Sequence, residues 1–335
     1  MKVLITGGLG FLGLRLARRL TELGRLTGPS GKPEAIDRLT LFDVAVPRPR
    51  PEGLDKRAEL VAGDIADRDT LFSLVDRDDI AVFHLASVVS GGAEKDFDLA
   101  MNVNLMGGLS LFEACRRLKS CPRLVYASSI AVFGGAAMPP VVGDTTKQTP
   151  QTTYGTTKAA LELFLNDYTR KGFFDGRTAR LPTVIIRPGK PNTAASSFAS
   201  GVFREPLKGE GCVVPVGRDT PMPVMGYREI VEGLIRLHEM DGALLGDDRA
   251  VSLPSLTVTV GQMIEALQRV AGDRPLGKIT IAPDPFIEAI CRTWARDARF
   301  DRAITFGLPR AASLDQIIRA YIEDYVDPVG AKGAG

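Results

Sequence analysis

The stretch Lys2-Val-Leu-Ile-Thr6-Gly7-Gly8-Leu9-Gly10-Phe11-Leu12-Gly13 decides the fold of this chain. A short apolar strand enters a turn with glycines spaced G-x-x-G-x-x-G, and leucines and alanines at helical spacing follow as far as Leu23. A strand that passes through such a turn into a helix presents bare backbone amides and the positive end of a helix dipole. The pattern therefore predicts a dinucleotide pyrophosphate site, with Gly7, Gly10 and Gly13 against the phosphates.

Strands and helices alternate from this turn through the first two-thirds of the chain. Further strands are expected at residues 39–43, 60–62, 80–87, 124–129 and 183–187. This alternation predicts an α/β fold with a Rossmann-like doubly wound parallel sheet. We expect an NAD-binding Rossmann domain at residues 1–187, to which 223–259 returns. A smaller, discontinuous C-terminal substrate lobe is expected at 188–222 and 260–330.

Residues that follow the predicted strands are expected to line the cofactor site, because open parallel sheets bind ligands at the carboxyl ends of their strands. Asp43 ends the second strand and is placed to accept hydrogen bonds from the ribose hydroxyls of NAD. Its carboxylate would repel the 2′-phosphate of NADP, which Arg48 and Arg50 could otherwise neutralise, so NAD is favoured. The other expected cofactor residues at strand ends are Asp64, Ile65, Leu85, Ala86 and Ser87.

Tyr154-Gly-Thr-Thr-Lys158 begins a helical pattern that runs to about Tyr168. Residues four apart share a helix face, so the phenol and the ammonium can address one point in space. A phenol with a pKa near about 10 is a poor base at neutral pH, and a nearby cation favours its charged form. Ser129 ends the strand upstream and offers a hydroxyl to the same substrate oxygen. Together these residues predict a site that removes a proton.

The composition is that of an ordinary soluble enzyme: 335 residues, 44% hydrophobic and 24% charged. A net charge of +2 without a dense basic run gives no reason to expect nucleic acid or a membrane surface as partner. The short apolar runs and the direct entry into a strand at Met1 predict neither a membrane segment nor a signal peptide, hence a cytoplasmic protein. Four scattered cysteines and two histidines argue against a disulfide framework or a metal site. His84 lies inside an apolar strand and is interpreted as a core residue.

Taken together, the motifs of this chain resemble those of the extended short-chain dehydrogenase/reductase superfamily. These motifs are the glycine turn, Asp43, Gly63-Asp64, Asn104, Ser129 and Tyr154-x-x-x-Lys158. The chain resembles one member family, the D-erythronate dehydrogenases, more closely and over nearly its whole length. The segments that carry this resemblance are 88–94, 181–183, 187–192, 195–201, 204–207, 258–261 and 320–323. The resemblance implies a homodimeric NAD enzyme that oxidises the C2 hydroxyl of D-erythronate, a four-carbon sugar acid, to the 2-oxo acid.

The resemblance also implies roles for individual residues. Tyr154 would be the general base, Lys158 would lower its pKa and hold the nicotinamide ribose, and Ser129 would orient the substrate oxygen. Asn104 would support the helix that carries Tyr154, or a water relay to Lys158. Phe11 and Leu12 would join the glycines at the pyrophosphate, Asp64 and Ile65 would meet the adenine, and Pro188 would complete the cofactor site.

A sugar acid also needs a partner for its carboxylate, because a buried unpaired charge is costly. The residues expected to contact substrate are Ser90, Ser129, Tyr154, Lys190, Asn192, Ser196, Ser197 and Arg204, and nothing in the sequence ranks them.

Two other functions remain open at this point. A nucleotide-sugar epimerase would use the same serine, tyrosine and lysine, whereas Ile130-Ala131 replaces the acidic pair of the related dehydratases and argues against dehydration. A redox-sensing scaffold would bind the dinucleotide without turnover and would have no need of the three catalytic side chains. The homodimer rests on analogy: dimers of this superfamily commonly pair the helices around Asn104 and Lys158.

Overall fold

The computed structural model describes residues 1–191 and 194–328, which form two compact units. The first unit holds Met1–Val132, Thr152–Arg180 and Val231–Ser252, and the second holds Phe133–Gln151, Leu181–Ile230 and the described part of Leu253–Gly335. Segments 133–151 and 181–187 therefore group with the second unit, although the sequence places them in the stretch 1–187. Segments 223–230 and 253–259 group there as well.

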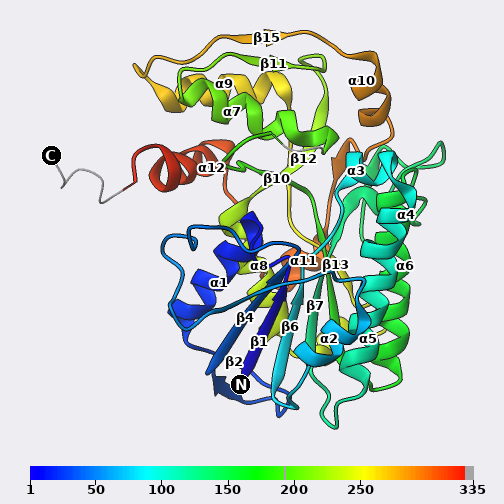
Figure 1. Cartoon of the computed structure of the whole chain (residues 1–335). Helices are drawn as coiled ribbons and strands as arrows, with labels where there is room; N and C mark the ends of the chain where they lie inside the picture. The colour runs from blue at the N-terminus through cyan, green and yellow to red at the C-terminus, as the bar shows by residue number, and fades with distance from the viewer. Residues whose placement is uncertain (192–193, 329–335) are drawn as a thin grey trace, which may run out of the picture. The chain divides into compact units, whose positions relative to one another are not determined.

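A seven-stranded sheet forms the centre of the first unit, in the order β13-β9-β7-β6-β1-β4-β5 (Figure 1). Its strands are β1 (Lys2–Thr6), β4 (Arg38–Asp43), β5 (Glu59–Ala62), β6 (Ile80–His84), β7 (Arg123–Ser129), β9 (Asp175–Leu181) and β13 (Ala250–Ser252). The chain begins in the middle of the sheet, where β1 pairs in parallel with both β4 and β6. Strand order reverses at β1, and this reversal opens a crevice at the carboxyl ends of the strands. The expected Rossmann-like doubly wound parallel sheet is confirmed.

Helices cover both faces of this sheet. On one face, α1 (Phe11–Leu23) packs on β1 and β4, and Arg19 joins it to Glu232 of α8 (Tyr227–Glu239) with an Nε–Oε1 distance of 2.6 Å. On the other face, α2 (Arg68–Leu74), α5 (Gly107–Arg116) and α6 (Thr153–Arg170) enclose a core that includes Phe112 and Tyr126. The remaining elements of this unit are β2 (Arg25–Thr27), β3 (Pro33–Ala35), α3 (Ser90–Lys95), α4 (Phe97–Ala100), η1 (Met101–Met106), η2 (Ile130–Val132) and η4 (Gly242–Leu245).

The second unit contains a three-stranded sheet and two short strand pairs. The sheet consists of β10 (Thr183–Ile185), β12 (Pro221–Gly226) and β14 (Leu256–Thr259), and the pairs are β11 (Cys212–Val214) with β15 (Ile279–Ile281) and β8 (Val141–Val142) with β16 (Asp297–Ala298). Its helices are η3 (Ala195–Ser197), α7 (Phe198–Leu207), α9 (Val260–Ala271), α10 (Pro285–Cys291), α11 (Asp301–Thr305), α12 (Leu314–Tyr321) and η5 (Ile322–Val326). The strand pairing explains the grouping of the chain, because β8 and β10 pair with strands that follow residue 220.

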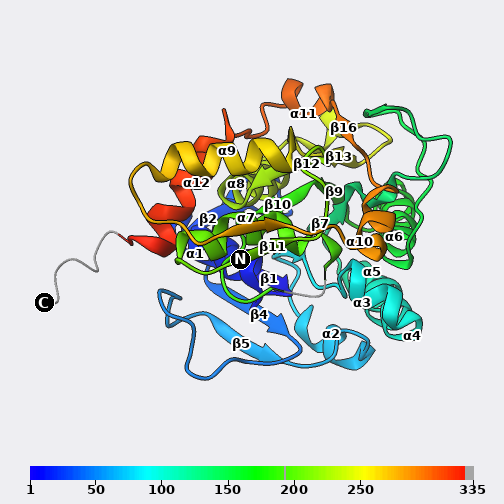
Figure 2. The ribbon, with the colours of Figure 1, turned by 90° about the horizontal axis from the view of Figure 1, so that it is seen from above.

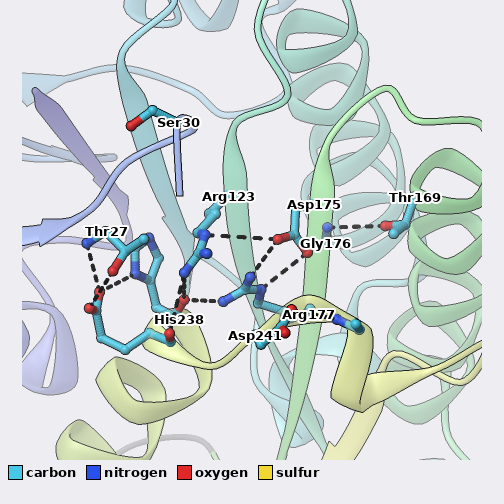
Figure 3. Close-up of polar contacts among 12 residues, drawn as sticks. Thr27, Ser30, Arg123, Thr169, Asp175, Gly176, Arg177, His238 and Asp241 are labelled. Carbon is cyan, nitrogen blue, oxygen red and sulfur yellow. Dashed lines mark hydrogen bonds and ion pairs between the residues drawn. The ribbon is translucent and has the colours of Figure 1, made fainter. Parts of the chain in front are cut away.

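Two arginine side chains form hydrogen bonds that hold the amino ends of β7 and β9 in the first unit (Figure 3). Arg177, which is fully buried, donates to the carbonyl of Leu237 at 2.9 Å, and Arg123 donates to the carbonyl of His238 at 2.8 Å. Asp175, the first residue of β9, accepts hydrogen bonds from Arg177. The two arginines thereby satisfy carbonyls of the last turn of α8, which have no partner inside the helix. This cluster lies at the edge of the sheet opposite the carboxyl ends, so it stabilises the fold away from the predicted site.

Candidate functional site

The glycine turn between β1 and α1 leaves no room for side chains. Gly7 has a φ of +67°, and a Cβ on it would lie 2.7 Å from the backbone nitrogen of Ala86. A Cβ on Gly13 would lie 2.4 Å from the carbonyl oxygen of Gly7. Gly10 is exposed and forms the N-cap of α1 without a side-chain cap. The turn therefore offers the amino end of a helix to a ligand, an arrangement suited to phosphate.

Asp43, the last residue of β4, lies beside this turn. Its carboxylate accepts hydrogen bonds from the backbone nitrogen of Leu9 at 3.1 Å and from that of Val44 at 2.8 Å. Arg50 donates to the carbonyls of Asp55 and Ala58 at 2.7 and 2.8 Å, so this guanidinium holds its own loop. A carboxylate at the strand end and an arginine engaged with its own loop both favour NAD over NADP.

The end of β6 is fastened to β1 next to the turn. Thr6 Oγ1 lies 2.7 Å from His84 Nδ1, and the backbone nitrogen of Leu85 donates to the Thr6 carbonyl at 3.0 Å. This pairing brings Ala86 against Gly7. His84 is buried, as expected for a core residue, and burial together with the charge of Lys158 lowers its pKa to about 3. It is therefore neutral and structural.

Asn104 connects the segment after β6 to α6. It lies in η1, a π-helical turn, and its carboxamide accepts from the Val88 nitrogen at 2.7 Å and from Ser87 Oγ at 3.2 Å. The same side chain donates to the Val88 carbonyl at 3.0 Å and to Thr157 Oγ1 at 3.4 Å. Single π-helical turns are frequent at functional sites. The contacts of Asn104 fit support of the helix that carries Tyr154.

The helix α6 begins where the sequence predicts. Thr152 caps it by accepting from the Gly155 nitrogen at 3.0 Å, and Glu94 of α3 accepts from the Thr153 nitrogen at 2.7 Å. The Lys158 ammonium lies 5.5 Å from the centre of the Tyr154 ring and donates to the carbonyl of Ala127 at 2.8 Å. The predicted pair therefore shares one face of the helix, at the carboxyl end of β7.

Burial controls the charge of Lys158, whose exposed fraction is 3%. Desolvation lowers the pKa of its ammonium to about 7, and the carboxylate of Glu162 acts in the opposite direction. A lysine with a pKa near neutrality can respond to small electrostatic changes, and such perturbed groups cluster at functional sites.

The two serines at the end of β7 differ in their partners. Ser128 is buried and its hydroxyl donates to Glu162 Oε1. Ser129 is half-buried, and its oxygen accepts from the Ala131 nitrogen at 3.1 Å. A hydroxyl that accepts from the backbone keeps its proton to donate, so the contacts favour Ser129 over Ser128 as the substrate partner.

The remaining predicted cofactor residues occupy varied positions. Asp64 is exposed and its carboxylate accepts from the Ala66 nitrogen at 2.9 Å, whereas the side chain of Ile65 lies in the core. Phe11 and Leu12 form the first turn of α1. Leu85, Ala86, Ser87 and Pro188 are half-buried, and their contact with the cofactor stays a prediction.

Arg204 is buried and engaged with neighbouring residues, and its contact with a substrate carboxylate stays a prediction. It is 3% exposed, and its guanidinium donates to the Arg187 carbonyl at 2.9 Å and to Glu205 Oε1 at 3.1 Å. The role of the other candidates stays a prediction: Ser90 is the half-buried first residue of α3, Lys190 is exposed, and Ser196 and Ser197 are half-buried in η3. Asn192 lies outside the described residues.

Two acidic residues near the predicted site were not among the residues predicted from the sequence. Glu94 reaches the first turn of α6, and Glu162 receives Ser128 and Arg180. A signal for Glu162 existed, because it follows Lys158 by four residues and lies between the apolar Leu161 and Leu165, on a face where a lone carboxylate is costly. Glu94 carries no comparable signal in its own segment.

Two absences concern residues 1–191 and 194–328. There, no three or more histidine, cysteine, aspartate or glutamate side chains are grouped to hold a metal ion. None of the helices in this part of the chain is long and apolar enough to span a membrane.

Comparisons with known proteins agree on the family. A model of the NAD dependent epimerase/dehydratase family matches residues 3–245. The D-erythronate dehydrogenase of Cupriavidus necator is 50% identical over 97% of this chain and 98% of its own length, and that of Haemophilus influenzae is 38% identical over 96% and 99%. A solved structure described as the nucleoside-diphosphate-sugar epimerase from Agrobacterium tumefaciens has a TM-score of 0.89 at 40% identity, covering 98% of this chain and 95% of that one. The resemblance stated from the motifs is confirmed.

Proposed function

This chain belongs to the NAD dependent epimerase/dehydratase family, and we propose that it oxidises the C2 hydroxyl of D-erythronate to the 2-oxo acid. One observation carries the chemistry: Tyr154 and the buried Lys158 share a helix face at the edge of the sheet where the glycine turn also lies. The 50% identity to a D-erythronate dehydrogenase over nearly the full length supports the substrate.

The residues of the first unit fit NAD. Gly7 and Gly13 let the turn pack closely on its neighbours, because a Cβ there would collide with backbone atoms. The exposed N-cap Gly10 leaves the amino end of α1 to a pyrophosphate. Asp43 at the end of β4 supplies a carboxylate for the adenosine ribose. We therefore assign dinucleotide binding to the first unit and propose that the second unit contributes contacts to the sugar acid. When bound, NAD accepts the hydride from C2.

The proton follows a path through side chains of this chain. Loss of one proton can be shared between Tyr154 and Lys158, and one of the resulting forms is a phenolate beside an ammonium. The phenolate accepts the proton of the C2 hydroxyl, and the ammonium stabilises the negative charge on the phenol oxygen. Ser129 donates to the substrate oxygen and holds it in position. Asn104 keeps α6 fixed to the segment after β6 through Val88 and Thr157.

A panel of four- and five-carbon aldonic acids tests this function directly. With NAD, D-erythronate is expected to give the highest kcat/KM, followed through the absorbance of the reduced nicotinamide. NADP is expected to be at least about tenfold less effective, since Asp43 would face its 2′-phosphate at a cost of one to several kcal/mol. A protein that reduces NAD with none of the acids would argue for a dinucleotide-binding scaffold instead.

An epimerase is the second candidate, because a structure described as a nucleoside-diphosphate-sugar epimerase is 40% identical to this chain. Epimerisation would use the same three side chains but return the hydride to the sugar. The protein would then interconvert nucleotide sugars without net reduction of NAD. Release of reduced cofactor with a free sugar acid distinguishes the dehydrogenase from this alternative.

An exposed apolar face on the first unit supports the proposed homodimer. Helices α4, η1 and α6 pack against one another (Figure 2), and large apolar side chains stand exposed on them: Phe97, Leu99, Met106, Leu163 and Phe164. Exposed apolar patches of this kind mark interfaces, and this one lies on the helices that related dimers pair. Sedimentation should give twice the chain mass for the wild type and the single mass for Leu163→Arg. A wild-type monomer would contradict the proposal.

A further inference from the structure

A buried ion pair lies beside the predicted catalytic pair. Glu162 of α6 is 1% exposed, and Arg180 of β9 donates to its Oε2 through Nε at 2.9 Å and Nη2 at 2.7 Å. Ser128 of β7 donates to the other carboxylate oxygen. We propose that Glu162, held by Arg180 and Ser128, is a positioning residue that sets the protonation of the Tyr154–Lys158 pair. This inference rests on the proposed function.

This ion pair lies on the face of α6 that carries Lys158 and contacts the end of β7 through Ser128. Glu162 follows Lys158 by four residues, so the two side chains share a face of α6. Ser128 stands between Ala127, whose carbonyl receives the Lys158 ammonium, and Ser129, which offers its hydroxyl to substrate. The bond from Ser128 to Glu162 therefore fixes the strand end from which both groups act.

Stability alone is a poor reason for such a pair. Burying two charges costs more than their attraction commonly returns, and well-packed apolar residues serve a core as well or better. Removing one partner is different, because it leaves an uncompensated charge in a medium of low dielectric. Glu162 and Arg180 act on Lys158 with opposite signs, so the loss of either one would change the electrostatic field at the ammonium.

The other titratable groups around Lys158 are neutral. His84 of β6 is kept uncharged by a pKa of about 3, and burial raises the pKa of Tyr126 of β7, whose ring centre lies 4.9 Å from the ammonium. Tyr154 is the proposed base itself. Glu162 thus supplies the negative charge that opposes loss of the proton from Lys158, and Arg180 moderates it.

Two substitutions that should shift the pH profile in opposite directions test this role. Glu162→Gln removes a negative charge near Lys158, so the Tyr154–Lys158 pair should lose its proton more readily. Arg180→Met removes a positive charge, so the same pair should lose its proton less readily. With NAD and D-erythronate saturating, the pH at which kcat reaches half its maximum is expected to fall by about one unit in the first variant and to rise by about one unit in the second. The double variant should return to within about 0.3 unit of the wild type.

The opposite signs separate this role from general damage to the fold, which would move both variants alike. Shifts in one direction, or no shift in proteins with a wild-type melting curve, overturn the proposal. Glu162→Asp retains the charge and should shift the profile less than Glu162→Gln. If the single charge variants do not fold, Ser128→Ala tests the proposal instead, because it deletes only one hydroxyl. Its kcat should fall about tenfold, since the end of β7 loses its fixed position. An unchanged kcat in that variant rejects the positioning role.

A titration that needs no substrate distinguishes this inference from the proposed function. Protein labelled with ¹³C at lysine Cε reports the protonation of Lys158, with the resonance assigned through Lys158→Met. The midpoint should lie near pH 7 in the wild type and move as stated in the two variants. Shifted midpoints in a protein inert toward aldonic acids would reject the function and retain the network. Turnover of D-erythronate in a protein with unshifted midpoints would retain the proposed function and reject the network.

Discussion

Replacing Tyr154 with phenylalanine is expected to lower kcat for D-erythronate about 10³-fold, within the 10² to 10⁴ that a positioned base contributes. The substitution keeps the ring, which lies 5.5 Å from the Lys158 ammonium, and deletes the oxygen that accepts the proton. The affinity for reduced NAD should change less than threefold, since the glycine turn and Asp43 are untouched. Steady-state kinetics and fluorescence titration of the reduced cofactor measure the two quantities.

Tyr168 provides a matched control for this prediction. It lies on the same helix, and its hydroxyl donates to Glu113 Oε1 at 2.5 Å, away from the site. Tyr168→Phe should lower the melting temperature slightly, by the loss of a hydrogen bond worth about 1–3 kcal/mol, and leave kcat within twofold. Equal effects of the two substitutions, or wild-type turnover in Tyr154→Phe, would remove Tyr154 as the base.

Replacing Lys158 with methionine should have the second largest effect, a loss of about 10²-fold or more in kcat. Methionine fills the volume but supplies no charge to stabilise a phenolate, so the pH of half-maximal activity should rise toward about 10, the ordinary pKa of a phenol. In the wild type that pH should lie well below 10, because the Tyr154–Lys158 pair loses its first proton more readily than an isolated phenol does. Removal of a buried lysine can also stabilise the fold, because its desolvation is relieved.

Lys171 is the control for this second substitution. It is the exposed C-cap of α6, so Lys171→Met changes the same residue type on the same helix far along from the site. Its pH profile should coincide with that of the wild type. A Lys158→Met enzyme with an unchanged profile would show that the ammonium does not set the charge of the base.

Much of the first unit was predictable because its signals are local. The apolar stretch before Gly7 predicted a strand, the glycine spacing predicted a turn, and the helical pattern from Tyr154 to about Tyr168 predicted α6. The grouping of 133–151 with the second unit was not predictable, because it depends on the pairing of Val141 and Val142 with Asp297 and Ala298, more than 150 residues later. No pattern inside a short strand specifies its partner.

In the candidate site, too, local sequence signals predict some features, whereas others depend on the fold. Tyr154 and Lys158 follow from a spacing of four on one helix, and Asp43 from its place at the end of a strand. Arg204 carries chemistry that suits a carboxylate, and only the fold shows that its neighbours are Glu205 and the Arg187 carbonyl. Composition identifies a charge, whereas only its neighbours decide whether that charge is available.

The sequence by itself determined the fold class and the cofactor type and named the residues that we propose for catalysis, since periodicity and motif spacing are properties of neighbouring positions. Tertiary structure decided the rest: Asn104 reaches Val88 and Thr157, and Glu162 receives Arg180 and Ser128 from two different strands. These contacts join residues 16 to 53 positions apart. Their physical effect, through desolvation and charge at short range, exists only once the chain has folded.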